Sequence, residues 1–141
     1  MNQLGQFIIN HWQLWLAFIL IFLIIFINEL YTQKNQAKSV SNSDAIQMIN
    51  DEDAAIFDLR DAETFRAGHI AHAIRVASDD FSKKSMEKYK TKPLILICAR
   101  GIQSATLATQ LRAQGFMRAM SLSGGIAAWQ EANLPLVKGK N

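Results

Sequence analysis

The feature that most constrains the fold is a run of four apolar residues, 94–97, that leads directly into the only cysteine of the chain, Cys98. The run is too short for a helix of its own and follows Pro93, so it predicts a strand buried on both faces. A short loop containing Gly101 comes next, and a helical pattern begins at Ser104. We therefore expect an α/β fold with Cys98 at the carboxyl end of a central parallel strand, where such sheets bind their ligands.

Cys98 in this position would have the surroundings of a nucleophile. We expect the loop after it to curl so that its backbone N–H groups, with the start of the next helix, form a cup for an anion. Negative charge is favoured at the amino end of a helix, which biases a thiol there towards thiolate. The alternative is a structural role, because an isolated cysteine at the end of a strand is usually a small buried hydrophobic residue.

The remainder of the C-terminal part alternates between predicted strands and helices. Besides 94–97, short apolar strands are predicted at 54–57, within 69–76 and at 119–122. Helices are predicted after caps at Ser43–Asp44 and Asp61, over the exposed stretch 78–90, from Ser104 to Gly115, and from about Ile126. This alternation predicts a parallel sheet with helices on both faces, and about a hundred residues suffice for one such core.

The N-terminal segment is the most apolar part of the chain. Residues 14–27 carry no polar side chain, and extension back to Phe7 gives about 31 Å of helix, the thickness of a bilayer core. Trp12 and Trp15 suit one membrane interface and Tyr31 the other. A cleaved signal peptide would need a basic start and a small-residue cleavage site after the apolar run, and the sequence offers neither. We expect residues 1–31 to form a single-pass transmembrane anchor.

The polar residues after the anchor define the rest of the organisation. We expect a linker at 32–42, a folded domain at 43–137 and a tail at 138–141. Lys34 and Lys38 follow the span and no basic residue precedes it, so the positive-inside rule predicts a cytoplasmic domain. The net charge of +3 is small, and the lysines at 83–92 are typical of a solvated helix face, so we expect no nucleic-acid partner. One cysteine excludes an internal disulfide.

Three motifs in residues 40–137 resemble the signatures of the rhodanese domain family. Its first signature is similar to Asp58-Leu59-Arg60, Phe65, Gly68-His69-Ile70 and Ala73. Its active-site loop is similar to Cys98-x-x-Gly101-x-x-Ser104. Its closing signature is similar to Leu122-x-Gly124-Gly125-x-x-Ala128-Trp129, followed by Leu134-Pro135. With its anchor, the chain looks like the membrane-anchored single-domain rhodaneses of bacteria.

The resemblance implies a three-layer α/β fold and sulfurtransferase activity. Cys98 would take the outer sulfur of a donor such as thiosulfate as a persulfide and pass it to a thiol or a protein cysteine. The sulfur-containing anion would bind to the loop residues Ala99, Arg100, Gly101, Ile102, Gln103 and Ser104. No metal and no organic cofactor is implied. The resemblance also implies a location in the bacterial inner membrane, and it leaves room for a protein partner there.

Departures from the family leave a second function open. Many thiosulfate-using members have arginine directly after the cysteine and again before the serine, where this chain has Ala99 and Gln103. Arg100 is the one basic residue in the loop, so a dianionic donor should be held more weakly. The alternative is a membrane-tethered binding or scaffold module with little turnover.

Phosphatase chemistry and several catalytic roles are disfavoured by the residues present. Cysteine phosphatases end a Cys-x5 loop in an arginine that clamps the phosphate, and this chain has Ser104 there. Asp58 and Arg60 are expected to pair with each other or with backbone and so to support the loop. His69 is expected to cap or pack a turn, and Gly124 and Gly125 to form a turn into a helix.

Overall fold

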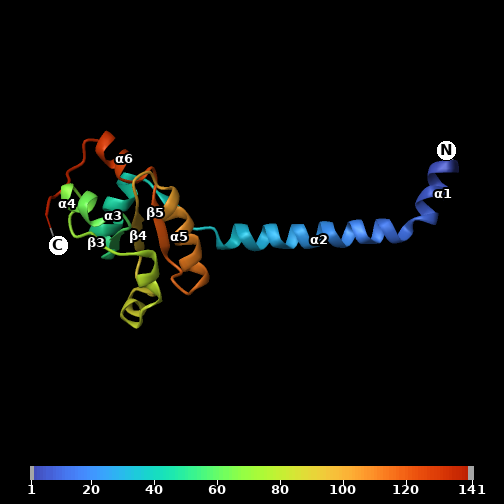
Figure 1. Cartoon of the computed structure of the whole chain (residues 1–141), viewed down its shortest axis with the longest axis horizontal. Helices are drawn as coiled ribbons and strands as arrows, with labels where there is room; N and C mark the ends of the chain where they lie inside the picture. Colours follow the sequence, from blue (N-terminus) through green and yellow to red (C-terminus); the bar gives the residue numbers. More distant parts are fainter. Residues whose placement is uncertain (1, 140–141) are drawn as a thin grey trace. The chain divides into compact units, whose positions relative to one another are not determined.

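The computed structural model describes residues 2–139, and the chain divides into two compact units, one up to Asn35 and one from Gln36 onward. The first unit consists of helices α1 (Asn2–Asn10) and α2 (Trp12–Asn35), and the second is an α/β domain (Figure 1). The predicted fold class, a parallel α/β domain preceded by one apolar helix, is confirmed.

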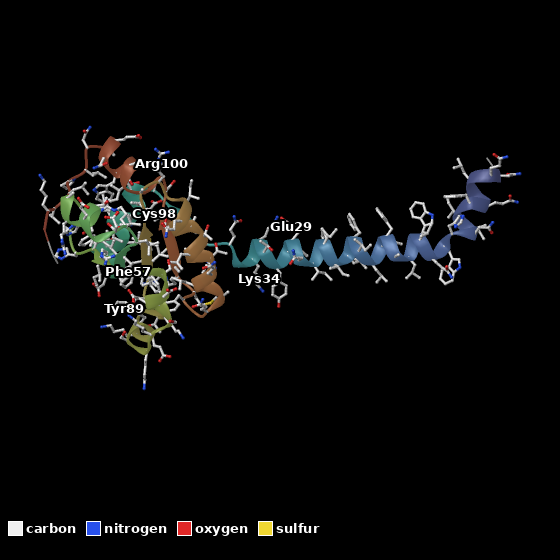
Figure 2. All side chains as sticks on the ribbon, in the orientation of Figure 1. Glu29, Lys34, Phe57, Tyr89, Cys98 and Arg100 are labelled. Carbon is white, nitrogen blue, oxygen red and sulfur yellow. The ribbon has the colours of Figure 1, made fainter. Side chains whose placement is uncertain are left out.

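Within residues 2–139, α2 is the one helix that is long and apolar enough to cross a membrane, from Trp12 to Lys34. Figure 2 shows its side chains, with Glu29 and Lys34 near its end. The span predicted from Phe7 to Ile27 is shifted, since the helix is interrupted at His11 and continues past Ile27 to Asn35. The interruption is a tight turn in which the Leu14 N–H donates to the His11 carbonyl at 2.9 Å.

The second unit is built on a five-stranded parallel sheet in the order β1-β5-β4-β2-β3. Its strands are β1 (Ser39–Val40), β2 (Ala55–Asp58), β3 (Ile74–Arg75), β4 (Leu94–Ile97) and β5 (Ala119–Leu122). β4 lies between β2 and β5, and all four of its residues are buried. The strand predicted before Cys98 is therefore the centre of the sheet, and the cysteine follows its carboxyl end.

Two hydrophobic cores, one on each face of the sheet, make the domain three-layered. Alternate residues of β4 serve the two cores, because successive side chains of a strand point to opposite faces. Ile95 and Ile97 join the core under α3 (Asn42–Glu52), α4 (Ala62–Ala67) and α6 (Gly125–Glu131). Leu94 and Leu96 join the core under α5 (Ile102–Ala113) and the short 3-10 helices η1 (Ser78–Ser82) and η2 (Lys84–Tyr89).

Residues 78–90 differ from the exposed helix that was predicted there. They form η1 and η2, and Phe81 and Met86 are buried. Phe81 and Tyr89 meet the ring of Phe57 edge to face, with centroids 5.4 and 5.0 Å away; Figure 2 labels Phe57 and Tyr89. The many charged residues between these aromatic side chains concealed this packing in the sequence.

The predicted linker at 32–42 also contains regular structure. It includes the last residues of α2, up to Asn35, and the edge strand β1, which pairs with β5. The helix α3 begins earlier than expected, because Ser41 rather than Ser43 caps it by accepting a hydrogen bond from the Asp44 N–H at 3.2 Å. Similarly, α5 begins at Ile102 and not at Ser104, so the cysteine loop is shorter than predicted.

Candidate active site

The sulfur of Cys98 is surrounded by the backbone of the loop that it begins. The Gly101 N–H donates to Sγ at 3.0 Å and the Ser104 N–H at 3.4 Å. The thiol and the Ser104 hydroxyl lie 3.3 Å apart. The loop therefore has the inward-facing N–H groups that were expected, and they converge on the sulfur itself.

These contacts lower the pKa of the Cys98 thiol below its ordinary value. Burial of the sulfur raises the pKa because it disfavours the charged thiolate. The hydrogen bonds from the Ser104 side chain and from the backbone of Ser104, Gly101 and Arg100 lower the pKa and outweigh burial. More of this thiol is thus ionised at neutral pH than of an ordinary cysteine, and the thiolate is the reactive form.

The burial of Cys98 alone does not separate a nucleophile from a structural residue, since only 4% of it is exposed. Its surroundings do separate them. A structural cysteine packs among apolar side chains, whereas the Cys98 sulfur accepts hydrogen bonds from two backbone N–H groups and is hydrogen-bonded to the Ser104 hydroxyl. The site has the polar environment that stabilises a sulfur anion.

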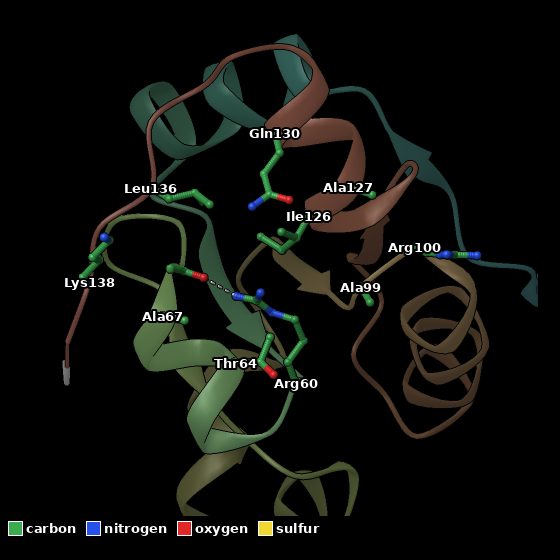
Figure 3. Close-up of a pocket in the computed structure, with 11 residues that line it drawn as sticks. Arg60, Thr64, Ala67, Ala99, Arg100, Ile126, Ala127, Gln130, Leu136 and Lys138 are labelled. Atoms are coloured by element: carbon green, nitrogen blue, oxygen red, sulfur yellow. Dashed lines mark hydrogen bonds between the residues drawn. The ribbon is translucent and has the colours of Figure 1, made fainter.

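A pocket of about 540 Å³ opens beside the cysteine loop, with Ala99 and Arg100 in its wall (Figure 3). The other lining residues come from the segments around α4 and α6 and from the C-terminal segment: Arg60, Thr64, Ala67, Gly68, Ile126, Ala127, Gln130, Leu136 and Lys138. The cysteine loop reaches this pocket through Ala99 and Arg100, the two residues that follow Cys98.

The start of α6, just after the two glycines of the closing signature, is hydrogen-bonded to the cysteine loop. The Ile126 N–H donates to the Cys98 carbonyl at 3.0 Å, and the Ala127 N–H donates to the Ala99 carbonyl at 3.1 Å. Gly125 has φ +60°, and a Cβ there would lie 2.3 Å from the Cys98 carbonyl oxygen. This role of Gly125 was not predicted from the sequence. The sequence held a signal for it, because Gly124 and Gly125 come shortly after β5, and Cys98 comes directly after the neighbouring strand β4.

Asp58 and Arg60 form an ion pair at the end of β2. Asp58 is fully buried, and its carboxylate accepts from Arg60 Nε at 3.0 and 3.1 Å and from Nη2 at 2.8 Å. Arg60 Nη2 also donates to the Gly68 carbonyl at 2.7 Å (Figure 3). The expected pairing is present, and it fastens Arg60 into the pocket wall. Support of the cysteine loop by this pair stays a prediction.

The six loop residues predicted to bind an anion fall into three groups, those that contact the sulfur, those that line the pocket and those that are exposed on the surface. Gly101 and Ser104 contact the sulfur, and Ala99 and Arg100 line the pocket. Arg100 is exposed, and Figure 3 shows its side chain extending away from Arg60. Ile102 and Gln103 are exposed, with Ile102 76% exposed.

His69 has the packing role that was expected. It is buried, its Nδ1 lies 2.8 Å from the Phe65 carbonyl, and its ring stacks on Phe65 with centroids 3.8 Å apart. Within residues 2–139, no three His, Cys, Asp or Glu side chains gather in an arrangement that could hold a metal ion.

The C-terminal segment, residues 134–139, forms part of the pocket wall, although residues 138–141 were predicted to be a tail. Leu136 and Lys138 line the pocket, and Val137 forms an antiparallel bridge with His69. Residues 140 and 141 of the predicted tail lie outside the described residues. Lys138 was not predicted as a site residue, because nothing in the local sequence shows that the segment folds back.

Comparisons with known proteins assign the chain to a family. The family model for the rhodanese-like domain matches residues 41–132. The protein YibN of Escherichia coli K12, described as uncharacterized, is 33% identical over 99% of this chain and 100% of its own length. A thiosulfate sulfurtransferase, GlpE of Pseudoalteromonas translucida, is 33% identical over 67% of this chain and 90% of its own length.

Solved structures show the same fold. A rhodanese-related protein of Thermoplasma volcanium superposes with a TM-score of 0.62 at 25% identity, over 72% of this chain and 99% of that one. A thiosulfate sulfurtransferase of Pseudomonas aeruginosa superposes with a TM-score of 0.65 at 18% identity, over 75% of this chain and 20% of that one. The second likeness concerns the fold alone.

Proposed function

This chain belongs to the rhodanese-like domain family, and from that premise we propose that it is a sulfurtransferase that carries sulfane sulfur as a persulfide on Cys98. The observation that carries the proposal is the convergence of the Gly101 and Ser104 N–H groups and the Ser104 hydroxyl on Sγ. Relatives named thiosulfate sulfurtransferase, about one third identical to this chain, support the same reaction class.

The proposed reaction has two displacement steps at one sulfur atom. With thiosulfate as donor, the Cys98 thiolate attacks the outer sulfur, a new S–S bond forms, and sulfite leaves with the electron pair of the broken bond. An acceptor thiolate then attacks the same outer sulfur, and Cys98 leaves as thiolate. The N–H groups of the loop would stabilise the anion on Cys98 before each step, as oxyanion-hole donors do.

Thiosulfate itself should be a weakly held donor. The loop positions that carry arginine in many thiosulfate-using relatives are Ala99 and Gln103 here, and Gln103 is exposed. The side chain of Arg100 is exposed as well. The same loss of charge favours the alternative function, a membrane-tethered binding or scaffold module with little turnover.

Mass spectrometry of the intact chain separates the two functions. The full chain in detergent is incubated with thiosulfate, or with an organic persulfide, and its mass is recorded before and after reduction. We expect a gain of one sulfur atom that reductant removes and that is absent from Cys98→Ser. If no donor adds sulfur to a folded wild-type chain, the sulfurtransferase proposal is wrong and the scaffold module is favoured.

We also propose that α2 anchors the protein in the bacterial inner membrane with the α/β domain in the cytoplasm. The apolar stretch from Trp12 to Lys34 supports an anchor, and Lys34 and Lys38 on its C-terminal side support the orientation. A reporter that is active only in the cytoplasm, fused after Asn141, should be active. Activity of a reporter that works only in the periplasm would overturn the orientation.

A further inference from the structure

The pocket beside Ala99 and Arg100 of the cysteine loop has room for more than a small inorganic donor. Its volume of about 540 Å³ falls within the roughly 300–1,000 Å³ that is typical of pockets for organic ligands. Thiosulfate is a compact ion and would fill only the part next to the cysteine loop. The remaining space, which extends to the C-terminal segment, is available for the body of a larger sulfur carrier.

The lining of the pocket combines apolar surface with positive charge. Ile126 and Leu136 provide apolar contacts, and both are shown in Figure 3 with Lys138 at the rim. The charge of Arg60 is already balanced by its ion pair with Asp58. Among residues 2–139, neither Lys138 nor Arg100 makes an ion pair. The Arg100 side chain extends away from Arg60 (Figure 3), so the charge of Lys138 is the one that we assign to a bound anion.

The backbone on both sides of Lys138 is fixed to the domain. The Val137 N–H donates to the His69 carbonyl at 2.8 Å, and the His69 N–H donates to the Val137 carbonyl at 2.9 Å. The Gly139 N–H donates to the Arg66 carbonyl at 3.0 Å. Lys138 is thus placed at the pocket by main-chain hydrogen bonds, which distinguishes it from a lysine on a free tail.

Resting on the proposed function, we infer that the pocket takes an organic sulfur carrier with a carboxylate group, which Lys138 binds, while its aliphatic part lies against Ile126 and Leu136. As a donor, the carrier is a persulfide, R–S–SH. The Cys98 thiolate attacks its outer sulfur, which moves to Cys98 with its proton as Cys98–S–SH, and R–S⁻ leaves with the electron pair of the broken S–S bond. The reverse reaction describes the thiol R–SH, as its thiolate, acting as acceptor. Lys138 is a specificity residue and takes no part in the bond changes.

Equilibrium binding tests this inference without any sulfur transfer. The probes are N-acetyl-S-methylcysteine, which has a carboxylate and no transferable sulfur, and its neutral amide, each titrated into the full chain in detergent. We expect the carboxylate to bind up to about fivefold more tightly than the amide, the upper end of the range for an exposed ion pair, since Lys138 is exposed. Lys138→Gln should remove this preference, and Lys84→Gln, at an exposed lysine of η2, should keep it. Equal affinities in the wild type, or a preference that survives Lys138→Gln, would overturn the inference.

Kinetics then separate a failure of this inference from a failure of the proposed function. The donors are the persulfides of N-acetylcysteine and of its amide, and sulfur loading of Cys98 is followed by mass. We expect Lys138→Gln to raise about fivefold the donor concentration that gives half the maximal loading rate, for the carboxylate donor only, with the maximal loading rate unchanged. Loading that shows no preference for the carboxylate contradicts the role of Lys138. Absence of loading by every donor, with the thioether preference intact, contradicts sulfur transfer and leaves the binding site standing.

Discussion

At the scale of single residues, the reactivity of Cys98 depends on a balance between burial and hydrogen bonds. Burial of the sulfur works against the thiolate, and the donors from Ser104, Gly101 and Arg100 work for it. Ser104 contributes twice, through its N–H and through its hydroxyl. Its hydroxyl is the one of these donors that a side-chain substitution removes without altering the backbone.

Ser104→Ala should therefore slow the reaction of Cys98 at neutral pH. With the hydroxyl gone, the pKa of the thiol rises towards its ordinary value, and the thiolate fraction at pH 7 falls several-fold. Because only the thiolate reacts, the rate of alkylation by iodoacetamide should rise with pH in both proteins. The variant should reach its plateau at a higher pH than the wild type, and the two rates should become equal in alkaline solution. Ser85→Ala, at an exposed serine of η2, is the control and should match the wild type. Identical pH profiles for Ser104→Ala and the wild type would contradict this account.

The local sequence predicts the position of Cys98, but it does not predict which distant residues line the pocket beside the cysteine loop. Cys98 is flanked by the strand and helix that position it, so its place could be predicted from adjacent residues. Lys138 reaches the same pocket through a bridge between Val137 and His69, residues far apart in the chain. Neither its charge nor its spacing from other residues indicates that contact, and only the folded chain reveals it.

At the scale of elements, the cysteine loop and the turn before α6 form one unit. Their backbones approach so closely that only glycine fits at position 125, where a Cβ would lie 2.3 Å from the Cys98 carbonyl oxygen. The two hydrogen bonds from Ile126 and Ala127 depend on that approach. The shape of the loop is thus set by an element that follows it by more than twenty residues.

Gly125→Ala should both destabilise the domain and reduce sulfur loading of Cys98. We expect a loss of at least about 2 kcal/mol in the free energy of unfolding, because the backbone clash adds to the strain of a positive φ. Gly139→Ala is the matched control: Gly139 also has positive φ, +101°, but a Cβ there meets no atom within 4 Å. Denaturant unfolding and intact mass measure the two effects. Equal stability losses in the two variants would show that the close approach is unimportant.

The elements that could be predicted from the sequence are those with a strong local pattern. β4 is an apolar run beside a proline, and α4 begins at the Asp61 cap, whose carboxylate accepts from the Thr64 N–H at 2.9 Å. β1 has two residues, one of them the serine Ser39, so it carries no pattern of its own and exists because β5 offers an edge. The start of α5 at Ile102 was missed because Gly101 at φ +87°, rather than a capping side chain, precedes it.

At the level of the whole molecule, the candidate site and the candidate membrane span lie in different units. The residues that contact the Cys98 sulfur and those that line its pocket belong to the unit that begins at Gln36. The unit that ends at Asn35 holds the helix that could span a membrane. The fold class could be predicted from the alternation of strands and helices, and the apolar segment from composition.

Deletion of residues 1–35 should release the domain from the membrane without changing its chemistry. The sheet keeps β1, because the strand begins at Ser39, and the contacts of Cys98 all lie beyond the cut. We expect the shortened chain to move to the soluble fraction and to load sulfur at the wild-type rate, with circular dichroism as the check on folding. A folded but inactive product would mean that the N-terminal unit takes part in the reaction.

The enclosure of Cys98 has a consequence for how long a captured sulfur would last. With 4% of the residue exposed, the sulfur of Cys98 has little contact with bulk solvent. The lifetime of the cargo would then be governed by how often a suitable recipient enters the adjoining cavity. Cys98 would thus hold the transferred sulfur until an acceptor binds, and the residues that line the cavity would also determine which acceptors react.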